Sequence, residues 1–162
     1  MHDISFQGAS LTLKGPRGIG TVTLRDLSDD GSPISFGSIN PIRTSKTMHG
    51  IMLAWHAQTQ PQFSISPIPG SASDVSLRAL LLSAQVRDDR DVVPLIQVLL
   101  SKAVLKIPSQ TGTDGVVKGG VFTFTNGFLV GGAAAIGSTG EGRQVTGQYQ
   151  FMWERVESPR SL

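Results

Sequence analysis

The segment QYQFMWERVE, residues 148–157, alternates strictly between two kinds of side chain. Tyr149, Phe151 and Trp153 share one face of an extended chain, whereas two glutamines, a methionine and a glutamate share the other. Alternation with a period of two indicates a β-strand with different surroundings on its two faces. We therefore expect the aromatic face to lie in the core and the other face to meet solvent or a neighbouring protein.

The same alternation recurs along most of the chain and predicts a protein made mainly of strands. Val22 and Leu24 share one face of TVTLRDL, and Phe63 and Ile65 share one face of QFSIS. The pair at 126–127, Asn-Gly, is typical of a tight turn, so we expect a hairpin with strands at 121–125 and 128–130. Further strands are expected at residues 4–13 with a break at Gly8, 21–27, 33–37, 63–67, 92–100, 103–107 and 144–156, with turns or loops at 28–32, 108–115 and 137–143.

One segment, SASDVSLRALLLSAQ, has the periodicity of a helix. We expect a helix at about residues 73–85, with Ser73 as its N-cap and Asp74 at the positive end of the helix dipole. A helix this short is marginal alone, so it should pack on a sheet. Four apolar residues follow the i, i+3, i+4, i+7 pattern and should face that sheet: Leu77, Leu80, Leu81 and Ala84.

These elements predict a mainly β fold, a sandwich or partly closed barrel with one packed α-helix, in a single domain of residues 1–162. Residues 38–62 carry no helical stripe and contain Gly50, which weakens a helix. We expect this stretch to be a long β-hairpin, with two extended arms around the sequence KTMHG.

Composition limits the functions that this chain can have. Charged residues make up 16% of its 162 residues, against about 25% in an average soluble domain, which suggests that other copies cover much of the surface. The net charge of +2 gives weak steering toward nucleic acid. Cysteine is absent, so thiol chemistry is excluded. We expect no signal peptide and no membrane span, since no apolar run approaches about 20 residues.

Candidate chemical motifs all favour simpler interpretations. His49 and His56 are seven residues apart in an expected hairpin and carry no accompanying glutamate, so a metal site is not expected. The DDRD cluster at 88–91 fits a solvated turn better than a calcium loop. The glycine-rich stretches GPRGIG and GGAAAIGSTGEG lack the ending of a phosphate loop. We therefore expect no catalysis, no metal and no cofactor.

Three stretches of the chain, taken in their order, stand out: SPISFGSINPIRTSKTMHGIMLAWHAQTQPQFSISPIPGSASDVSLRALL, FTFTNGFLVGG and STGEGRQVTGQYQFMWE. Together they resemble the tail tube proteins of tailed bacteriophages and their baseplate-proximal relatives. In that family a strand enters a long hairpin, a second strand returns, and a helix beginning at Ser-x-x-Asp follows. These parts correspond here to Ile34–Phe36, Ser38–Gln60, Phe63–Pro67 and Ser73–Gln85.

The resemblance implies a structural virion protein that is made in the host cytoplasm and assembles as a hexameric ring. The hairpins of six subunits would join into a β-barrel around a channel for the genome, without sequence-specific DNA binding. Its partners would be identical copies and adjacent tube, sheath or baseplate proteins, with no membrane. Whether it is a repeating tube ring or a ring joining the tube to the baseplate stays open.

The long hairpin supplies the candidate interface residues. We expect Arg43 and Lys46 to face a subunit contact or the ring exterior, because cations in the channel would retain DNA. The apolar members have an alternative place in the core of their own subunit. The candidates for contacts between subunits or rings are Arg43, Lys46, Met48, His49, Ile51, Met52, Trp55 and His56.

Two other functions remain open from the sequence. A secretion-system tube protein shares the fold and the hexameric assembly, so the sequence separates it poorly from a phage protein. A β-sandwich that binds a ligand or carbohydrate should display aromatic side chains on a platform, whereas most aromatic residues here alternate toward a core.

Overall fold

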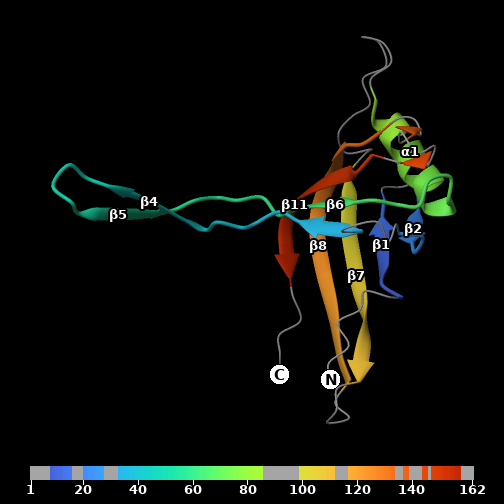
Figure 1. The fold of residues 1–162 in the computed structure, drawn as a ribbon, viewed down its shortest axis with the longest axis horizontal. Coiled ribbons are helices and arrows are strands. Elements are labelled where there is room, and N and C mark those ends of the chain that lie inside the picture. The colour runs from blue at the N-terminus through green and yellow to red at the C-terminus, as the bar shows by residue number, and fades with distance from the viewer. Residues whose placement is uncertain are drawn as a thin grey trace.

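The computed structural model describes residues 8–15, 20–27, 33–85, 99–111, 117–133, 137–138, 144–145 and 147–157. Figure 1 shows the strands and the single helix formed within these ranges. In chain order they are β1 (Ser10–Lys14), β2 (Thr21–Leu24), β3 (Ile34–Phe36), β4 (Ile42–Lys46), β5 (Met52–His56), β6 (Gln62–Ile65), α1 (Ala72–Ala84), β7 (Leu100–Thr111), β8 (Val117–Gly131), β9 (Gly137–Ser138), β10 (Gln144–Val145) and β11 (Tyr149–Glu157).

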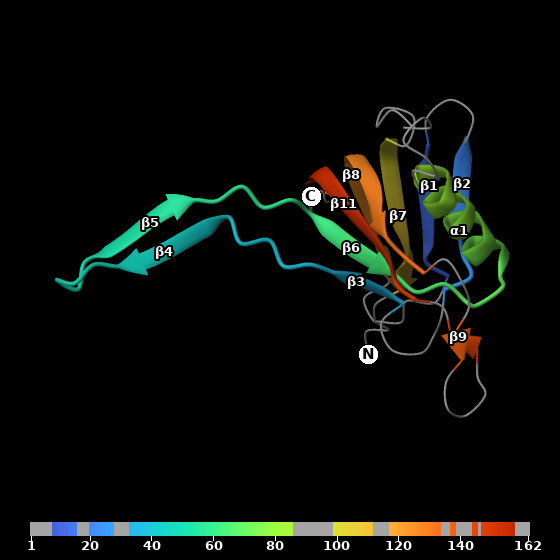
Figure 2. The ribbon, with the colours of Figure 1, turned by 90° about the horizontal axis from the view of Figure 1, so that it is seen from above.

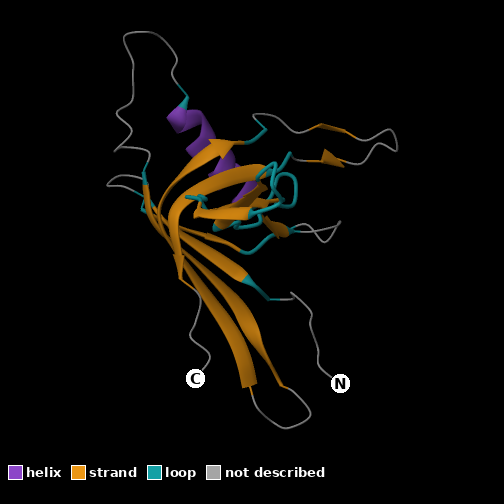
Figure 3. Ribbon diagram, turned by 90° about the vertical axis from the view of Figure 1, so that its left-hand side faces the viewer, coloured by secondary structure: helices purple, strands orange, loops and turns teal. Residues whose placement is uncertain are grey.

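The body of the molecule is a seven-stranded antiparallel sheet in the order β2-β1-β7-β8-β11-β6-β3. The helix lies across one face of this sheet, close to β1 and β2 (Figure 2). The sheet curves strongly, and β7 and β8 extend beyond their neighbours at one end (Figure 3). The described strands do not close into a barrel. A mainly β, sandwich-like fold with one packed helix is therefore confirmed. No described helix is long and apolar enough to cross a membrane.

The core is built from the inward-facing residues of the strands, as their alternation predicts. Tyr149, Phe151 and Trp153 are all at most 1% exposed, which confirms the aromatic face of the last strand. Phe63 lies at the centre of an aromatic cluster, with its ring centroid 5.1 Å from that of Phe151 and 4.8 Å from that of Phe124. Such large buried rings contribute much of the apolar area that stabilises a domain of this size.

The helix begins close to its predicted position, but its N-cap is Ser71 and not Ser73. The Ser71 hydroxyl accepts a hydrogen bond from the Asp74 backbone N–H at 3.2 Å. Ser73 is instead buried in the first turn, where its hydroxyl accepts hydrogen bonds from two backbone N–H groups just after β2. Leu77 and Leu80 are buried against the sheet, as the helical periodicity predicts. Two nearby serines precede the apolar run, and the sequence pattern alone favoured the wrong one.

The predicted hairpin at Asn126-Gly127 is wrong, because β8 continues through both residues. Leu100 of β7 and Trp153 of β11 both pair with Gly127, so β8 has a strand on each side at this point. Asn126 has a positive φ of 48°, whereas Gly127 does not. A type I′ hairpin turn needs positive φ at both central residues, so the Asn-Gly pair does not form that turn here.

At Asn126, instead, the alternation of inward-facing and outward-facing residues is interrupted. Leu100 and Ala103 of β7 are both buried, although residues three apart point to opposite faces of a regular strand. On β11, Trp153 is buried and Val156 also packs against the core. Gly127 is required in this row because a Cβ there would overlap the Trp153 ring. Asn126 therefore changes which residues of the strand face the core, and Gly127 leaves room for the Trp153 ring.

The remaining boundaries differ from the predictions in smaller ways. The segment predicted as a turn from residue 108 continues as a strand to Thr111, where it pairs with Val117. The last predicted strand is divided into β10 and β11, and β10 pairs with β9 in the region predicted as a loop. The break at Gly8 is confirmed by its φ of 80°. The predictions for residues 4–7, 28–32, 88–98, 112–115 and 139–143 lie outside the described residues.

Candidate functional site

The hairpin predicted at residues 38–62 is present and projects away from the body. We call residues 38–61 the arm. Its strands β4 and β5 form a two-stranded sheet of their own, separate from the body sheet. Figures 1 and 2 show this sheet held far from the helix and the core. Between residues 38 and 60 no side chain is buried, whereas the adjoining strand β6 contains the core residues Phe63 and Ile65.

The tip of the arm is closed by local hydrogen bonds around Thr47. The Thr47 backbone N–H donates to the Ile51 carbonyl at 2.9 Å, and the Gly50 N–H donates to the Thr47 carbonyl at 2.9 Å. The Thr47 hydroxyl also accepts from the Ile51 N–H at 3.1 Å. Gly50 has a φ of 83°, which glycine adopts at little cost. The KTMHG sequence is thus a defined turn that exposes Met48 completely.

The base of the arm is paired as well, so the arm leaves the body as a two-chain ribbon. The Ala57 N–H donates to the Pro41 carbonyl at 2.9 Å, and the Thr59 hydroxyl donates to the Asn40 carbonyl at 3.0 Å. At the body, the Trp153 backbone N–H donates to the Pro61 carbonyl at 2.8 Å. These bonds tie the exposed ribbon directly to the aromatic strand β11.

The register of β4 and β5 divides the arm into two faces. Arg43 pairs with Trp55 and Ser45 with Leu53, while Lys46 pairs with Met52. Because side chains alternate along a strand, neighbouring pairs point to opposite faces. The Trp55 face contains Arg43, Ser45, Ile51, Leu53 and Trp55. The Met52 face contains Ile42, Thr44, Lys46, Met52, Ala54 and His56.

All eight candidate interface residues lie on the arm and are exposed. Met48 is fully exposed, and Ile51, Met52 and Trp55 are 62%, 71% and 49% exposed. The alternative interpretation, that these apolar residues form the core of their own subunit, is therefore wrong. Their contact with another subunit stays a prediction. His49 lies in the tip and His56 at the end of β5, both exposed.

The charge of the arm is a feature of the sequence that its motifs do not reveal. Residues 31–73 contain no aspartate or glutamate, and the arm carries Arg43 and Lys46. These two cations lie on opposite faces, since Lys46 is three positions after Arg43 along β4. The arm therefore presents exposed apolar side chains and positive charge on each face, with no negative charge to balance either.

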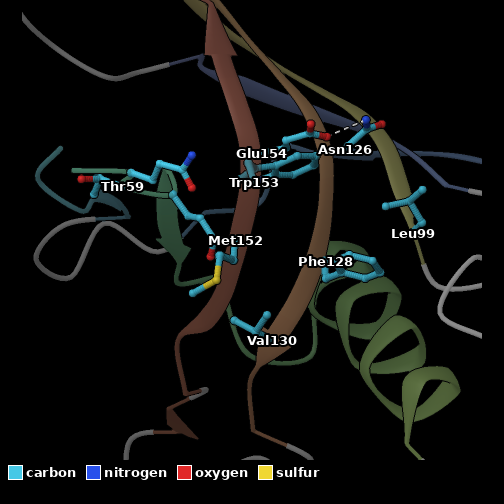
Figure 4. A pocket seen from close by; sticks show the side chains of 10 residues that line it. Thr59, Leu99, Asn126, Phe128, Val130, Met152, Trp153 and Glu154 are labelled. Atoms are coloured by element: carbon cyan, nitrogen blue, oxygen red, sulfur yellow. Dashed lines mark hydrogen bonds between the residues drawn. The ribbon is translucent and has the colours of Figure 1, made fainter. Parts of the chain in front are cut away.

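A groove of about 670 Å³ lies where the arm meets the outer face of β8 and β11 (Figure 4). We call it the Met152 groove. Apolar side chains line much of it, and Glu154 is the one charged side chain among the described residues that line it. The Glu154 carboxylate accepts a hydrogen bond from the Asn126 side-chain amide at 2.9 Å. The lining residues are Gln58, Thr59, Gln60, Leu99, Asn126, Phe128, Val130, Met152, Trp153 and Glu154.

A second, smaller groove of about 310 Å³ lies on the opposite side of the arm base, where the core-facing side of the sheet extends beyond the helix. Phe36 and Ile39 are 51% and 48% exposed there. The described residues that line it carry no charge: they are Phe36, Gly37, Ile39, Pro61, Gln62, Phe122, Phe124 and Val156.

Asp74 is the one fully buried carboxylate among the described residues, and its contacts are structural. Its two oxygens accept hydrogen bonds from the Tyr149 hydroxyl at 3.0 Å, the Gly70 N–H at 3.0 Å and the Arg78 guanidinium at 2.6 Å. Burial, and then the hydrogen bond to Asp74, raise the pKa of Tyr149 above its usual value. The cluster joins the helix to the last strand.

Metal-ligand geometry is not found in the described part of the chain, where no three histidine, aspartate or glutamate side chains group together. In the Met152 groove the Thr59 hydroxyl donates to the Asn40 carbonyl, and the Glu154 carboxylate accepts from the Asn126 amide. The expectations of no catalysis, no metal and no cofactor stay predictions.

Comparison with known proteins gives one family. The family model described as tail fiber protein gp32 matches residues 2–157. Among solved structures, the chain is similar to the cap of the anti-feeding prophage, described as the cap that terminates the tube of that particle. The identity is 16% and the TM-score 0.48, over 99% of this chain and 93% of that one. No curated protein matched the sequence.

Proposed function

The chain belongs to the tail fiber protein gp32 family, and we propose that it builds a ring of six identical copies through its arm. Family membership makes it a structural protein associated with the phage tail and located in the virion. The resemblance to tail tube proteins thus indicated the right class of particle. The family carries a tail fiber description, so the tube-like ring is our proposal for how this protein acts within the tail.

The exposed arm is the observation that carries the proposal. The strands β4 and β5 pair with each other, so each has one edge without a partner among the described strands. Exposed edges of this kind pair readily with strands of other chains. If each copy pairs its β4 with β5 of the next copy, the edges are satisfied around a closed ring. A stable contact of this type should bury more than about 1,000 Å².

A wall of joined arms would have a channel side and an outer side. Each face carries three apolar residues, but those of the Trp55 face, Ile51, Leu53 and Trp55, are together larger than Ile42, Met52 and Ala54. The Trp55 face is therefore better suited to pack against the ring. The Met52 face would then line the channel, with Thr44, Ala54 and Lys46 among its residues. We predicted that Arg43 and Lys46 both avoid the channel. The register places them on opposite sides of such a wall, so only Arg43 would avoid the channel by facing outward.

This arrangement would guide DNA without catalysis. One lysine from each copy, Lys46, would face the channel, and each phosphate contact adds a salt-dependent term to DNA retention. A single ring of lysines would hold DNA weakly and allow it to slide. We propose that the chain is not an enzyme, and that its neighbours are tube, sheath or baseplate proteins of the same tail.

The family description favours a second candidate, attachment of a tail fibre. In this role the arm would bind a different protein, and copies of this chain alone would not form rings. A carbohydrate-binding role is less favoured, because the largest aromatic cluster is buried and the exposed Trp55 and Phe36 lie on separate elements. A secretion-system tube protein would form the same ring and differ in its neighbours.

Negative-stain electron microscopy of the purified full chain tests the proposal. We expect rings or short tubes of uniform bore with sixfold symmetry, and light scattering should give the mass of six chains. A strict monomer at high concentration would contradict the ring and favour fibre attachment.

A further inference from the structure

We propose that the Met152 groove is the seat of a neighbouring copy's arm, which lays its Trp55 face into the groove. This inference deepens the proposed ring and rests on it. It places Arg43 of the partner subunit beside Glu154, and Trp55 of the partner subunit against the apolar wall formed by Val130 and Met152. The inference assigns a surface on the body, whereas the ring itself requires only that arms meet one another.

The groove is shaped by the outward-facing residues of two adjacent strands. Phe128 and Val130 come from β8, and Met152 and Glu154 come from β11. Val130 is 53% exposed, which is high for a valine on the inner part of a sheet. A neighbour that covered this wall would remove apolar surface from water, at about 25 cal/mol per Å².

The groove and the Trp55 face are complementary in charge. Glu154 is exposed, and among the described residues that line the groove it is the one acidic side chain, with no lysine or arginine beside it. The arm has no acidic residue, and Arg43 pairs directly with Trp55 on the same face. An arginine beside an anchoring tryptophan therefore meets a carboxylate beside an apolar wall. Opposite charges placed in this way fix register and favour the correct partner.

The occupant has to be a second copy, because the chain's own arm leads away from the groove. Residues 58–60 of the arm form one side of the groove, and the ribbon continues outward from there (Figures 1 and 4). The own Trp55 is not among the lining residues. The smaller groove at Phe36 is also apolar, but the described part of its lining offers no acidic residue to Arg43. It is the alternative seat that the experiment must separate.

Disulfide trapping tests the seat directly, since the chain has no cysteine. Val130→Cys places a thiol in the groove, and Ser45→Cys places one on the Trp55 face. The matched control is Thr44→Cys, one residue away on the opposite face. After mild oxidation and non-reducing electrophoresis, we expect Ser45→Cys with Val130→Cys to give about 10-fold more crosslinked ladder than Thr44→Cys with Val130→Cys, because disulfides need Cα atoms within about 7 Å.

The outcomes separate this inference from the ring proposal. Rings in the microscope without preferential crosslinking overturn the seat and leave the ring standing. Trapping of Ser45→Cys by Phe36→Cys in place of Val130→Cys also overturns the seat, in favour of the smaller groove. A strict monomer overturns both proposals.

Charge exchange provides an independent test. Glu154→Arg and Arg43→Glu should each weaken assembly by about 10-fold, and the double variant should recover most of the loss. Glu157→Arg is the matched control, because Glu157 is exposed on the same strand and does not line the groove. Analytical ultracentrifugation measures assembly, and circular dichroism checks that each monomer is folded. Additive losses in the double variant would overturn the pairing of Arg43 with Glu154.

Discussion

The body buries its tryptophan, whereas the arm leaves its tryptophan exposed. The chain has two tryptophans. Trp153 in the body is 1% exposed, with its ring 5.8 Å from that of Phe63, while Trp55 in the arm is 49% exposed. Each lies on a β-strand next to other apolar residues. What differs is the covering of the two strands. Other parts of the chain cover the aromatic face of β11, whereas no described part of the chain covers either face of the arm.

This difference separates the apolar residues that stabilise the single chain from those that the single chain leaves exposed. An isolated two-stranded hairpin is at best marginally stable in water. The arm has a well-bonded turn and a paired base, but it lacks a covering layer. Its apolar side chains therefore gain little from folding of the single chain. A partner that covered them would gain most of their burial energy.

The largest expected effect is on the body, from Trp153→Ala. Truncation of a large buried aromatic residue typically lowers the free energy of unfolding by about 3–5 kcal/mol, because it leaves a cavity. Denaturant unfolding followed by circular dichroism measures this change. A loss below about 1 kcal/mol would show that the aromatic cluster does not carry the stability that the comparison assigns to it.

Gly127→Ala should have the next largest effect. A Cβ at this position would overlap the Trp153 ring, and overpacking of this kind costs about 1–3 kcal/mol. Gly131→Ala on the same strand is the control, because its Cβ would meet the Gln150 side chain at an ordinary 3.5 Å. Thermal unfolding of both variants distinguishes them. Equal melting temperatures would contradict the close contact between β8 and the tryptophan.

Tyr149→Phe should lower stability by about 1–2 kcal/mol near neutral pH, because it removes one donor from the buried Asp74 carboxylate. The pKa of Tyr149 is raised by burial and by this hydrogen bond, so the native state favours the neutral phenol. That contribution is complete below the unfolded pKa of about 10 and is lost as the pH rises through the raised native value.

The chain has a single tyrosine, so its ultraviolet titration reports this group alone. The wild-type protein should lose stability above about pH 10 more steeply than the phenylalanine variant. Ionisation of the phenol at the ordinary pH of a free tyrosine would contradict its burial.

Trp55→Ala should have the smallest effect on the monomer. Exposed substitutions usually change the free energy of unfolding by less than about 0.5 kcal/mol. The same substitution should abolish assembly, which size-exclusion chromatography would detect. Measuring the single variants Trp55→Ala and Trp153→Ala side by side gives the sharpest test of the difference between arm and body. A destabilised monomer would mean that the arm tryptophan packs within its own chain after all.

Sequence reasoning succeeded where one local pattern determined the structure. Alternation identified the inward faces of β2, β6 and β11, and the periodic leucines identified the helix. The arm was predicted with its turn at the correct place, since glycine and polar residues interrupt two extended runs. These features depend on neighbours in the sequence and are visible without a fold.

It failed where a position is decided by strands that are distant in sequence. Asn126-Gly127 has the residues of a hairpin turn, but pairing with both β7 and β11 keeps β8 continuous. The Met152 groove is formed by the arm base together with two other strands, so no local sequence pattern predicts it. The acid-free stretch of residues 31–73 was visible in the sequence, and counting charge along the chain would have found it.

The two bare edges of the arm have a consequence for how a ring would form. If copies join edge to edge, every unfinished arc keeps one free strand at each end, however many copies it contains. Only closure removes both. Partial arcs would then continue to grow or fall apart, and a population at equilibrium would consist of single chains and complete circles, with few species between them.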